Sequence, residues 1–228
     1  NELGKVFRIE SRVQGSRGIP GDWRNQKAHG GGMVLDWGIH LLDQALRIGE
    51  GRKLISVYAE LTNVTNEECD GFRVTLIFEG DLSMYVEVTT SNFIELPRWY
   101  ILGENGSAVI NDWDLNGEIV KVSDWENRDA VPILAGVGLT KTMAPRTDDT
   151  IKHYPLPKVD SNWTQFYENV FAALRGEEEQ LAALAVVDPL ELLARADGPV
   201  HGIGLNAQLP LQLLQQVKGI LGLPVHLV

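Results

Sequence analysis

The sequence predicts an α+β fold, in which helices pack on one face of an open, mainly antiparallel β-sheet. Six consecutive segments between residues 54 and 125 alternate in hydropathy or are rich in β-branched residues, and short turns of Gly, Asp and Asn separate them. Consecutive strands joined by tight turns form antiparallel sheets. Two further segments, residues 33–48 and 163–174, repeat apolar side chains at helical spacing instead.

The strands are expected to follow one another along the chain. Residues 5–13 place Phe7, Ile9 and Val13 on one side and Arg8, Glu10 and Arg12 on the other, which is typical of a half-solvated strand. Six more strands are expected at residues 54–63, 72–80, 82–90, 98–106, 107–113 and 118–125. We therefore expect a sheet of about six strands, which is an ordinary size.

Two helices are expected beside these strands. The first runs from Met33 to Ile48, and Gly49 closes it. The second is capped by Asp160 or Ser161, carries an aromatic and aliphatic stripe from Trp163 to Leu174, and ends at Arg175 and Gly176. Because such a stripe must be buried, we expect the second helix to lie on a large apolar surface such as a face of the sheet.

The rest of the chain gives weaker signals. Residues 126–158 lack periodicity and contain four prolines, which indicates a long surface loop with room for one strand. The Leu- and Ala-rich remainder is broken by prolines and is compatible with three short helices. We expect one domain over residues 1–178 and a C-terminal extension over residues 179–228 that packs on it.

The composition narrows the possible partners. The 228 residues carry a net charge of −11 and have a sequence pI of about 4.9, whereas a nucleic-acid partner requires clustered Lys and Arg. The single cysteine, Cys69, excludes an internal disulfide and a cysteine-based zinc site. Neither a run of about 18 apolar residues nor a signal peptide is visible. The sequence therefore predicts a cytoplasmic protein without a nucleic-acid or membrane partner.

The first helix carries a pair of polar residues whose side chains are suited to acid-base chemistry. Asp36 and His40 are four residues apart and share one helix face. A carboxylate at this spacing can orient an imidazole and stabilise its protonated form, so that the imidazole accepts a proton near neutral pH. The alternative is that the two side chains satisfy each other or the backbone. Residues 30–32 are all glycine, which lets another backbone or a flat ligand approach the start of the helix.

A metal site is another alternative to this acid-base pair. His29, Asp36, His40 and Asp43 have suitable ligand types. His29, however, lies in the loop before the glycines, and Asp36 already serves His40. No metal site is therefore expected.

The loop before the glycines contains Trp23 and Arg24. Arg24 can bind a carboxylate or sugar hydroxyls, and Trp23 can stack on a sugar ring. The alternative is a surface ion pair together with an aromatic anchor for the loop.

Several stretches together resemble a known family. The stretch "ELGKVFRIESRV" is followed by "GDWR" and "GGGMVLDWGIHLLDQALRI", and later by "RWYILGENGSAVI" and "DSNWTQFYENVFAALRGE". This pattern closely resembles the C-terminal domain of the glucose-fructose oxidoreductase, inositol dehydrogenase and MocA family of NAD(P)-dependent oxidoreductases. The similarity covers residues 2–178 and implies an open antiparallel sheet backed by helices.

The resemblance implies roles for the site residues. His40 would act as the catalytic base or acid on a substrate hydroxyl, and Asp36 would orient it. Trp23 and Arg24 would approach the substrate, and Asp43, at the last acidic position of the motif, would be a further substrate-binding residue. The substrate would be a sugar, a polyol or a related hydroxy compound, and hydride would pass between its carbinol carbon and NAD or NADP.

The resemblance also implies a second half and partner copies. The sequence has neither the Gly-rich βα turn of a Rossmann domain nor a Glu-Lys-Pro motif, so no cofactor-binding residue is assigned. We expect this chain alone to bind NAD(P) weakly or not at all and to turn nothing over. Because the open sheet face commonly mediates oligomerisation in this family, a homo-oligomer is expected.

Two other functions remain open at this stage. The chain is also compatible with a non-enzymatic binding or scaffold protein derived from this domain. A stand-alone hydrolase or isomerase would use Asp36 and His40 with a metal. No Ser or Cys lies in a recognisable nucleophile elbow, which argues against acyl transfer.

Overall fold

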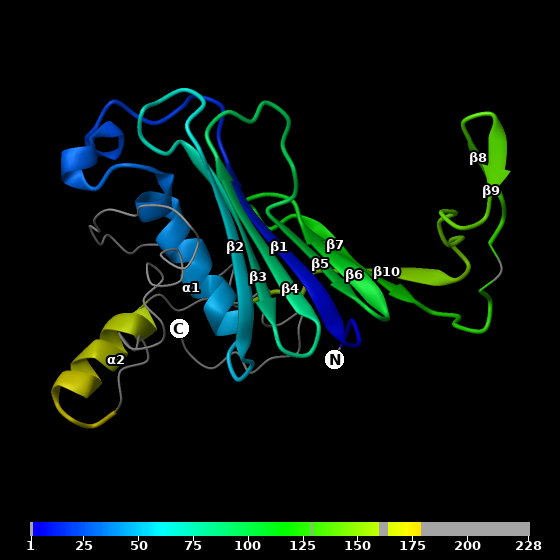
Figure 1. Ribbon diagram of the computed structural model, residues 1–228. Coiled ribbons are helices and arrows are strands. Elements are labelled where there is room, and N and C mark those ends of the chain that lie inside the picture. Colours follow the sequence, from blue (N-terminus) through cyan, green and yellow to red (C-terminus); the bar gives the residue numbers. More distant parts are fainter. Residues whose placement is uncertain (1, 129, 160–163, 179–228) are drawn as a thin grey trace.

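An open sheet organises the molecule, and the computed structural model describes residues 2–128, 130–159 and 164–178. The strands of this sheet are β1 (Val6–Gln14), β2 (Leu54–Thr62), β3 (Gly71–Phe78), β4 (Leu82–Thr89), β5 (Trp99–Gly103), β6 (Gly106–Ile110), β7 (Gly117–Val122) and β10 (Ile151–Pro155). They lie in the order β10-β7-β6-β5-β1-β4-β3-β2 (Figure 1). Only β1 and β4 pair in parallel, and the other neighbours are antiparallel. The predicted fold class is confirmed.

The sheet is larger than expected from the sequence. All seven predicted strands are present within a few residues of their expected bounds. β1 inserts between β5 and β4, and β10 extends the sheet beyond β7, which gives eight strands instead of about six. The expectation of a single strand in residues 126–158 was also wrong, because β8 (Ile133–Ala135) and β9 (Gly138–Thr140) form a separate hairpin there. Strands of three residues are too short to show a period, which is why the sequence did not reveal them.

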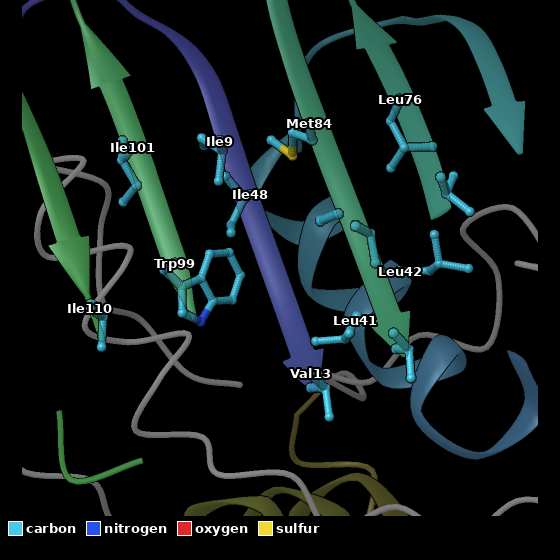
Figure 2. Packing of buried hydrophobic residues seen from close by; sticks show 14 of the residues in the cluster. Ile9, Val13, Leu41, Leu42, Ile48, Leu76, Met84, Trp99, Ile101 and Ile110 are labelled. Atoms are coloured by element: carbon cyan, nitrogen blue, oxygen red, sulfur yellow. The ribbon is translucent and has the colours of Figure 1, made fainter. Parts of the chain in front are cut away.

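One face of the sheet carries the apolar core. Alternate residues of β3 and β4, from Phe72 to Val88, are at most 2% exposed. The helix α1 (Ile39–Ile48) covers this face and buries Leu41, Leu42 and Ile48 against it (Figure 2). Trp99 of β5 lies in the same layer. Burial of this apolar area is the main stabilising contribution to the fold.

The predicted helix over residues 33–48 is confirmed, but its first turn is not α-helical. The π-helical segment η3 (Val34–Gly38) precedes α1, and the N–H of Ile39 donates to the carbonyl of Val34. Gly38 allows this turn to sit on the sheet, because a Cβ there would lie 2.9 Å from the ring of Phe72. The wide first turn therefore packs directly against the side chain of Phe72 in β3.

The second helix does not behave as predicted. α2 (Thr164–Leu174) forms where expected, but Tyr167, Phe171 and Leu174 are 46%, 59% and 75% exposed. In Figure 1, α2 lies beyond α1 and away from the sheet. These three residues of the stripe therefore do not pack on a sheet face, because α1 already covers the apolar face of the sheet. The expected cap residues of α2 and the expected extension, residues 179–228, lie outside the described residues.

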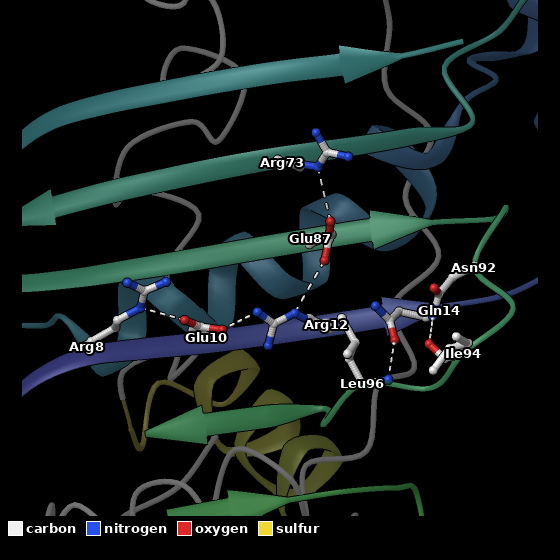
Figure 3. A network of polar contacts seen from close by, with 9 residues as sticks. All are labelled: Arg8, Glu10, Arg12, Gln14, Arg73, Glu87, Asn92, Ile94 and Leu96. Carbon is white, nitrogen blue, oxygen red and sulfur yellow. Dashed lines mark hydrogen bonds and ion pairs between the residues drawn. The ribbon is translucent and has the colours of Figure 1, made fainter. Parts of the chain in front are cut away.

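Ion pairs form a ladder across the opposite, outer face of the sheet. Figure 3 shows, in order, the side chains of Arg8, Glu10, Arg12, Glu87 and Arg73. An ion pair between Arg73 and Glu60 extends the ladder. Arg12 Nε lies 3.3 Å from Glu87, and Arg73 Nε lies 3.1 Å from the same carboxylate. The prediction of a half-solvated first strand was wrong at two positions. Glu10 is only 6% exposed and pairs with Arg8 and Arg12, and Phe7, expected on the apolar side, is 40% exposed because the register of β1 shifts between Val6 and Arg8. In the described part of the chain, no helix is long and apolar enough to span a membrane.

Candidate functional site

Three glycines join the loop of residues 15–29 to the first helix. Gly30 and Gly32 have φ angles of +76° and +98°, a region that favours glycine. A Cβ on Gly31 would lie 2.6 Å from the carbonyl oxygen of Arg24, and the N–H of Gly32 donates to that oxygen at 2.7 Å. Of the two approaches that the sequence left open, the structure contains the approach of another backbone.

Arg24 is held by three contacts in the folded loop. It belongs to the short helix η1 (Trp23–Asn25). Its Nε donates to Asp36 Oδ2 at 2.8 Å, and its Nη1 donates to Asp22 Oδ2 at 2.7 Å. The guanidinium carbon lies 4.8 Å from the ring centroid of Trp23. The hydrogen bond to Asp36 raises the pKa of Arg24. The ion pair considered as the alternative role of Arg24 is therefore present.

Asp36 and His40 lie one turn apart where η3 continues into α1. Asp36 belongs to the π turn and His40 to the first turn of α1. Both residues are half-buried, and the Asp36 side chain is 18% exposed. π turns inside α-helices are frequent at functional sites. The two side chains are therefore at the boundary between the core and the solvent and not sealed within the core.

Asp36 has a partner that the sequence did not suggest. Its Oδ2 accepts from Arg24, a residue of the preceding loop. The structure thus brings Trp23, Arg24 and Asp36 together, and it keeps His40 on the same helix. The orientation of His40 by Asp36 stays a prediction.

Asp43 lies apart from this cluster. It forms an ion pair of 2.8 Å with Arg47, one turn farther along α1, and its side chain is 52% exposed. Ion pairs of this kind on an exposed helix surface contribute little to stability. Its role in substrate binding stays a prediction.

The turn between β2 and β3 anchors the start of the helix. The N–H of Met33 donates to the carbonyl of Cys69 at 2.7 Å. The next residue, Asp70, accepts from the N–H of Val64 at 3.0 Å and from the hydroxyl of Thr65 at 2.8 Å. Burial alone would raise the pKa of Asp70, but these hydrogen bonds outweigh it and the pKa is lowered. A charged Asp70 therefore holds the turn against which the glycines pack.

The comparisons with known proteins agree with this arrangement. Residues 1–109 match the model of the GFO/IDH/MocA C-terminal domain. An NAD-binding protein from Listeria innocua is 46% identical, with a TM-score of 0.73, over 79% of this chain and 52% of that protein. Residues 1–109 belong to the GFO/IDH/MocA C-terminal domain family.

More distant structures share the fold of this GFO/IDH/MocA domain. The YPO2259 protein from Yersinia pestis has a TM-score of 0.60 at 19% identity, over 89% of this chain and 59% of that protein. An oxidoreductase from Bacillus cereus has a TM-score of 0.54 at 14% identity, over 80% of this chain and 53% of that protein. The chain therefore spans little more than half the length of these solved structures. No curated protein matches the chain.

The described residues do not contain a Rossmann βαβ unit. A Rossmann site needs a Gly-rich turn between a strand and a helix within a parallel βαβ unit. The parallel pair β1 and β4 is separated by α1, β2 and β3, and β2 to β4 follow one another as antiparallel neighbours. Among the residues that the structure describes, no three His, Cys, Asp or Glu side chains gather as metal ligands.

Sequence reasoning missed some residues around the site. Asp22 caps η1 by accepting from the N–H of Arg24 at 2.9 Å, and an aspartate before a short helix is a signal that could have identified it. Trp37, Trp113 and Arg98 also meet beside η3. These three residues are far apart in the chain, and no local pattern indicates their contact.

Proposed function

We propose that residues 1–178 bind the substrate and supply the proton-transfer residues of a nicotinamide-dependent oxidoreductase. The substrate would be a sugar, a polyol or a related compound, and the reaction would take place at one of its hydroxyl groups. The observation that carries the proposal is the half-buried position of His40 one turn after Asp36. The 46% identity to an NAD-binding protein supports the nicotinamide cofactor in this proposal.

His40 would move the hydroxyl proton. A half-buried imidazole keeps contact with solvent, through which the accepted proton can leave, and a neutral imidazole is a base of suitable strength near pH 7. Asp36 would stabilise the imidazolium that forms. Its hydrogen bond from Arg24 fixes the carboxylate on the loop side of the helix.

The loop would then hold the substrate in position. Trp23 offers an aromatic surface to a sugar ring, although one side of it is covered by Arg24. Arg24 would act mainly as a positioning residue, because two carboxylates already engage it. Asp43 would contribute at the rim of the site.

The nicotinamide cofactor would belong to another domain. When bound, NAD or NADP supplies hydride exchange at the carbon that carries the reacting hydroxyl. The described residues of this chain offer no dinucleotide-binding turn, so we infer that the chain alone forms no NADH. We further propose a cytoplasmic homo-oligomer that associates through the outer face of the sheet.

A chimeric enzyme would test this function. Residues 1–178 would replace the matching segment of the Listeria innocua protein, and a panel of sugars and polyols would be screened with NAD and NADP. We expect turnover with at least one of them. We expect the His40→Asn variant to lose about 10²- to 10⁴-fold in kcat, which is the usual contribution of a general acid or base.

His153 provides a matched control on the same domain. It is an exposed histidine whose Nδ1 lies 2.6 Å from Glu118, away from the proposed site. His153→Asn should leave kcat unchanged. If His40→Asn turned over as fast as the parent, another residue would move the proton. Steady NADH formation by the isolated chain, or a folded chimera that binds NADH and oxidises no compound of the panel, would contradict the proposal.

A further inference from the structure

A group of enclosed hydrogen-bond donors lies where β1 meets β5. In the described part of the chain, the buried side-chain atoms without a hydrogen-bond partner are Ser11 Oγ, Arg98 Nε and Nη1, Trp99 Nε1 and Arg12 Nε, and the last lies beside Glu87. Ser11, Arg98 and Trp99 are only 2%, 6% and 1% exposed. Buried polar groups are normally hydrogen-bonded, so these donors require an acceptor.

The three residues are neighbours in the sheet. Ser11 of β1 lies directly opposite Trp99 of β5 in the antiparallel ladder. Arg98 precedes Trp99, and its carbonyl accepts the N–H of Arg12 at 2.8 Å. Directly opposed residues on adjacent antiparallel strands have side chains within contact of each other. Ser11 and Trp99 therefore place two of the unsatisfied donors on neighbouring strands, and Arg98 adjoins them in the chain.

Two tryptophans connect this place to the candidate site. The guanidinium carbon of Arg98 lies 3.2 Å from the ring centroid of Trp113, and the rings of Trp113 and Trp37 are 5.8 Å apart. Trp37 is the residue after Asp36 and belongs to η3, which covers the core face. Arg98 therefore lies on the same side of the sheet as the candidate site.

Arg98 is a buried cation without a carboxylate. Burial lowers the pKa of Arg98 to about 10, so the guanidinium is still charged at neutral pH. On the outer face, Arg8, Arg12 and Arg73 all have carboxylate partners. A buried charge is normally paired, and one that lacks a partner costs several kcal/mol. None of the acidic residues that the structure describes forms an ion pair with Arg98.

Trp113 offers a route to Arg98. It lies in the turn between β6 and β7, which is closed by a hydrogen bond of 2.7 Å from the N–H of Asn111 to the carbonyl of Asn116. Its side chain is 48% exposed although it covers the guanidinium. Rotation of this one side chain would expose the face of the guanidinium that it covers.

We propose that Arg98, together with Ser11 and Trp99, binds an oxyanion, a carboxylate or phosphate group of a small molecule that enters beneath Trp113. Oxyanions suit this set because they accept several hydrogen bonds and neutralise a guanidinium. The binding itself needs no cofactor. If the same compound is the one oxidised, a consequence that rests on the proposed function, the substrate is an acidic sugar or a hydroxy acid.

The experiment measures anion binding to the 228-residue chain without any cofactor. Inorganic phosphate and gluconate are the anionic probes, sorbitol is the neutral probe, and sodium chloride keeps the ionic strength constant. Tryptophan fluorescence and the melting temperature are the readouts. We expect phosphate, gluconate or both to quench fluorescence with saturation and to raise the melting temperature, whereas sorbitol should do neither. The probe that binds identifies the phosphate or the carboxylate as the recognised group.

Two variants locate the binding. Arg98→Met should weaken anion binding more than about tenfold, because truncation of one partner of a buried charge pair is costly. Its melting temperature without anion should be unchanged or higher, because an unpaired buried charge is removed. Arg52→Met, at an exposed arginine in the turn after α1, is the matched control and should bind like the parent.

Three results would overturn the proposal. The first is the absence of a saturable response to either anion in the folded parent. The second is anion binding that survives in Arg98→Met. The third is a marked loss of stability in Arg98→Met without anion, which would mean that Arg98 has only a structural role. None of these results depends on oxidoreductase activity, so the proposed function stands or fails separately.

Discussion

The two faces of the sheet are stabilised in different ways, one by apolar packing and the other by ion pairs. On the core face, the side chains of β3 and β4 are apolar and α1 covers them. On the outer face, the intervening residues of the same strands and of β1 carry charges that pair within the plane of the sheet (Figure 3). Alternation along a strand therefore places two different kinds of stabilising interaction on either side of one backbone.

The two faces also differ in whether their charged side chains have partners of opposite charge. The outer ladder contains equal numbers of guanidinium and carboxylate groups, and each has a partner. On the same face, burial and the neighbouring carboxylate of Glu87 raise the pKa of Tyr85 in β4 to about 12. Beside the core face lies Arg98, which has no carboxylate partner among the described residues.

The largest effect is expected on the core face. Phe72→Ala should lower the free energy of unfolding by about 3–5 kcal/mol, because it removes a side chain that is 1% exposed and leaves a cavity beneath Gly38. Denaturant unfolding measures the change. Phe93→Ala is the control, since Phe93 is 83% exposed and its loss should change stability by less than about 0.5 kcal/mol. A small effect of Phe72→Ala would mean that the core face is loosely packed.

A smaller effect is expected on the outer face. Glu10→Gln should cost about 2 kcal/mol, because it withdraws the carboxylate that lies between Arg8 and Arg12 on a largely buried part of the ladder. Glu118→Gln, in an exposed pair with His153, should cost little. Chemical denaturation in low and high salt compares the two variants. Equal costs would show that the ladder behaves as an ordinary set of surface ion pairs.

The smallest effect is expected at Asp70. Its carboxylate accepts hydrogen bonds from N–H and O–H groups, whereas the carboxylates of the outer ladder pair with guanidinium groups. Because the pKa of Asp70 is lowered by folding, its stabilising contribution is present above its unfolded pKa and is lost as the pH falls through the folded value. Asp70→Asn should cost about 1 kcal/mol at pH 7 and flatten the decline in stability below about pH 4. Unfolding curves recorded at pH values from about 2 to about 7 measure how the stability of the parent and of the variant depends on pH. An unchanged acid profile would mean that Asp70 is not held as a carboxylate.

The sequence predicted the strands more accurately than their arrangement. Tight turns and period-2 alternation located β2 to β7 within a few residues. Nothing local could indicate that β1 pairs in parallel with β4 in the middle of the sheet, because such pairing depends on contacts between distant segments. The stripe of α2 was read correctly as apolar, but its exposed position follows from the cover that α1 already gives.

The candidate site was predicted in its composition but not in its contacts. Trp23, Arg24, Asp36, His40 and Asp43 were named from the motif, and the structure brings the first three together. The hydrogen bond from Arg24 to Asp36 depends on Gly30 and Gly32, whose positive φ angles fold the loop back. The glycine-rich sequence permits this geometry but does not specify it. The meeting of Arg98, Trp113 and Trp37 had no signal in the sequence.

The sequence by itself determined the α+β class, the first helix with Asp36 and His40, and the acidic character that disfavours nucleic acid. The tertiary structure decided which carboxylate Arg24 binds, which face of the sheet α1 covers and which buried donors lack an acceptor. The physical reason is that periodicity and turn chemistry act between residues close together in the chain. Charge pairing and burial depend on how distant segments meet.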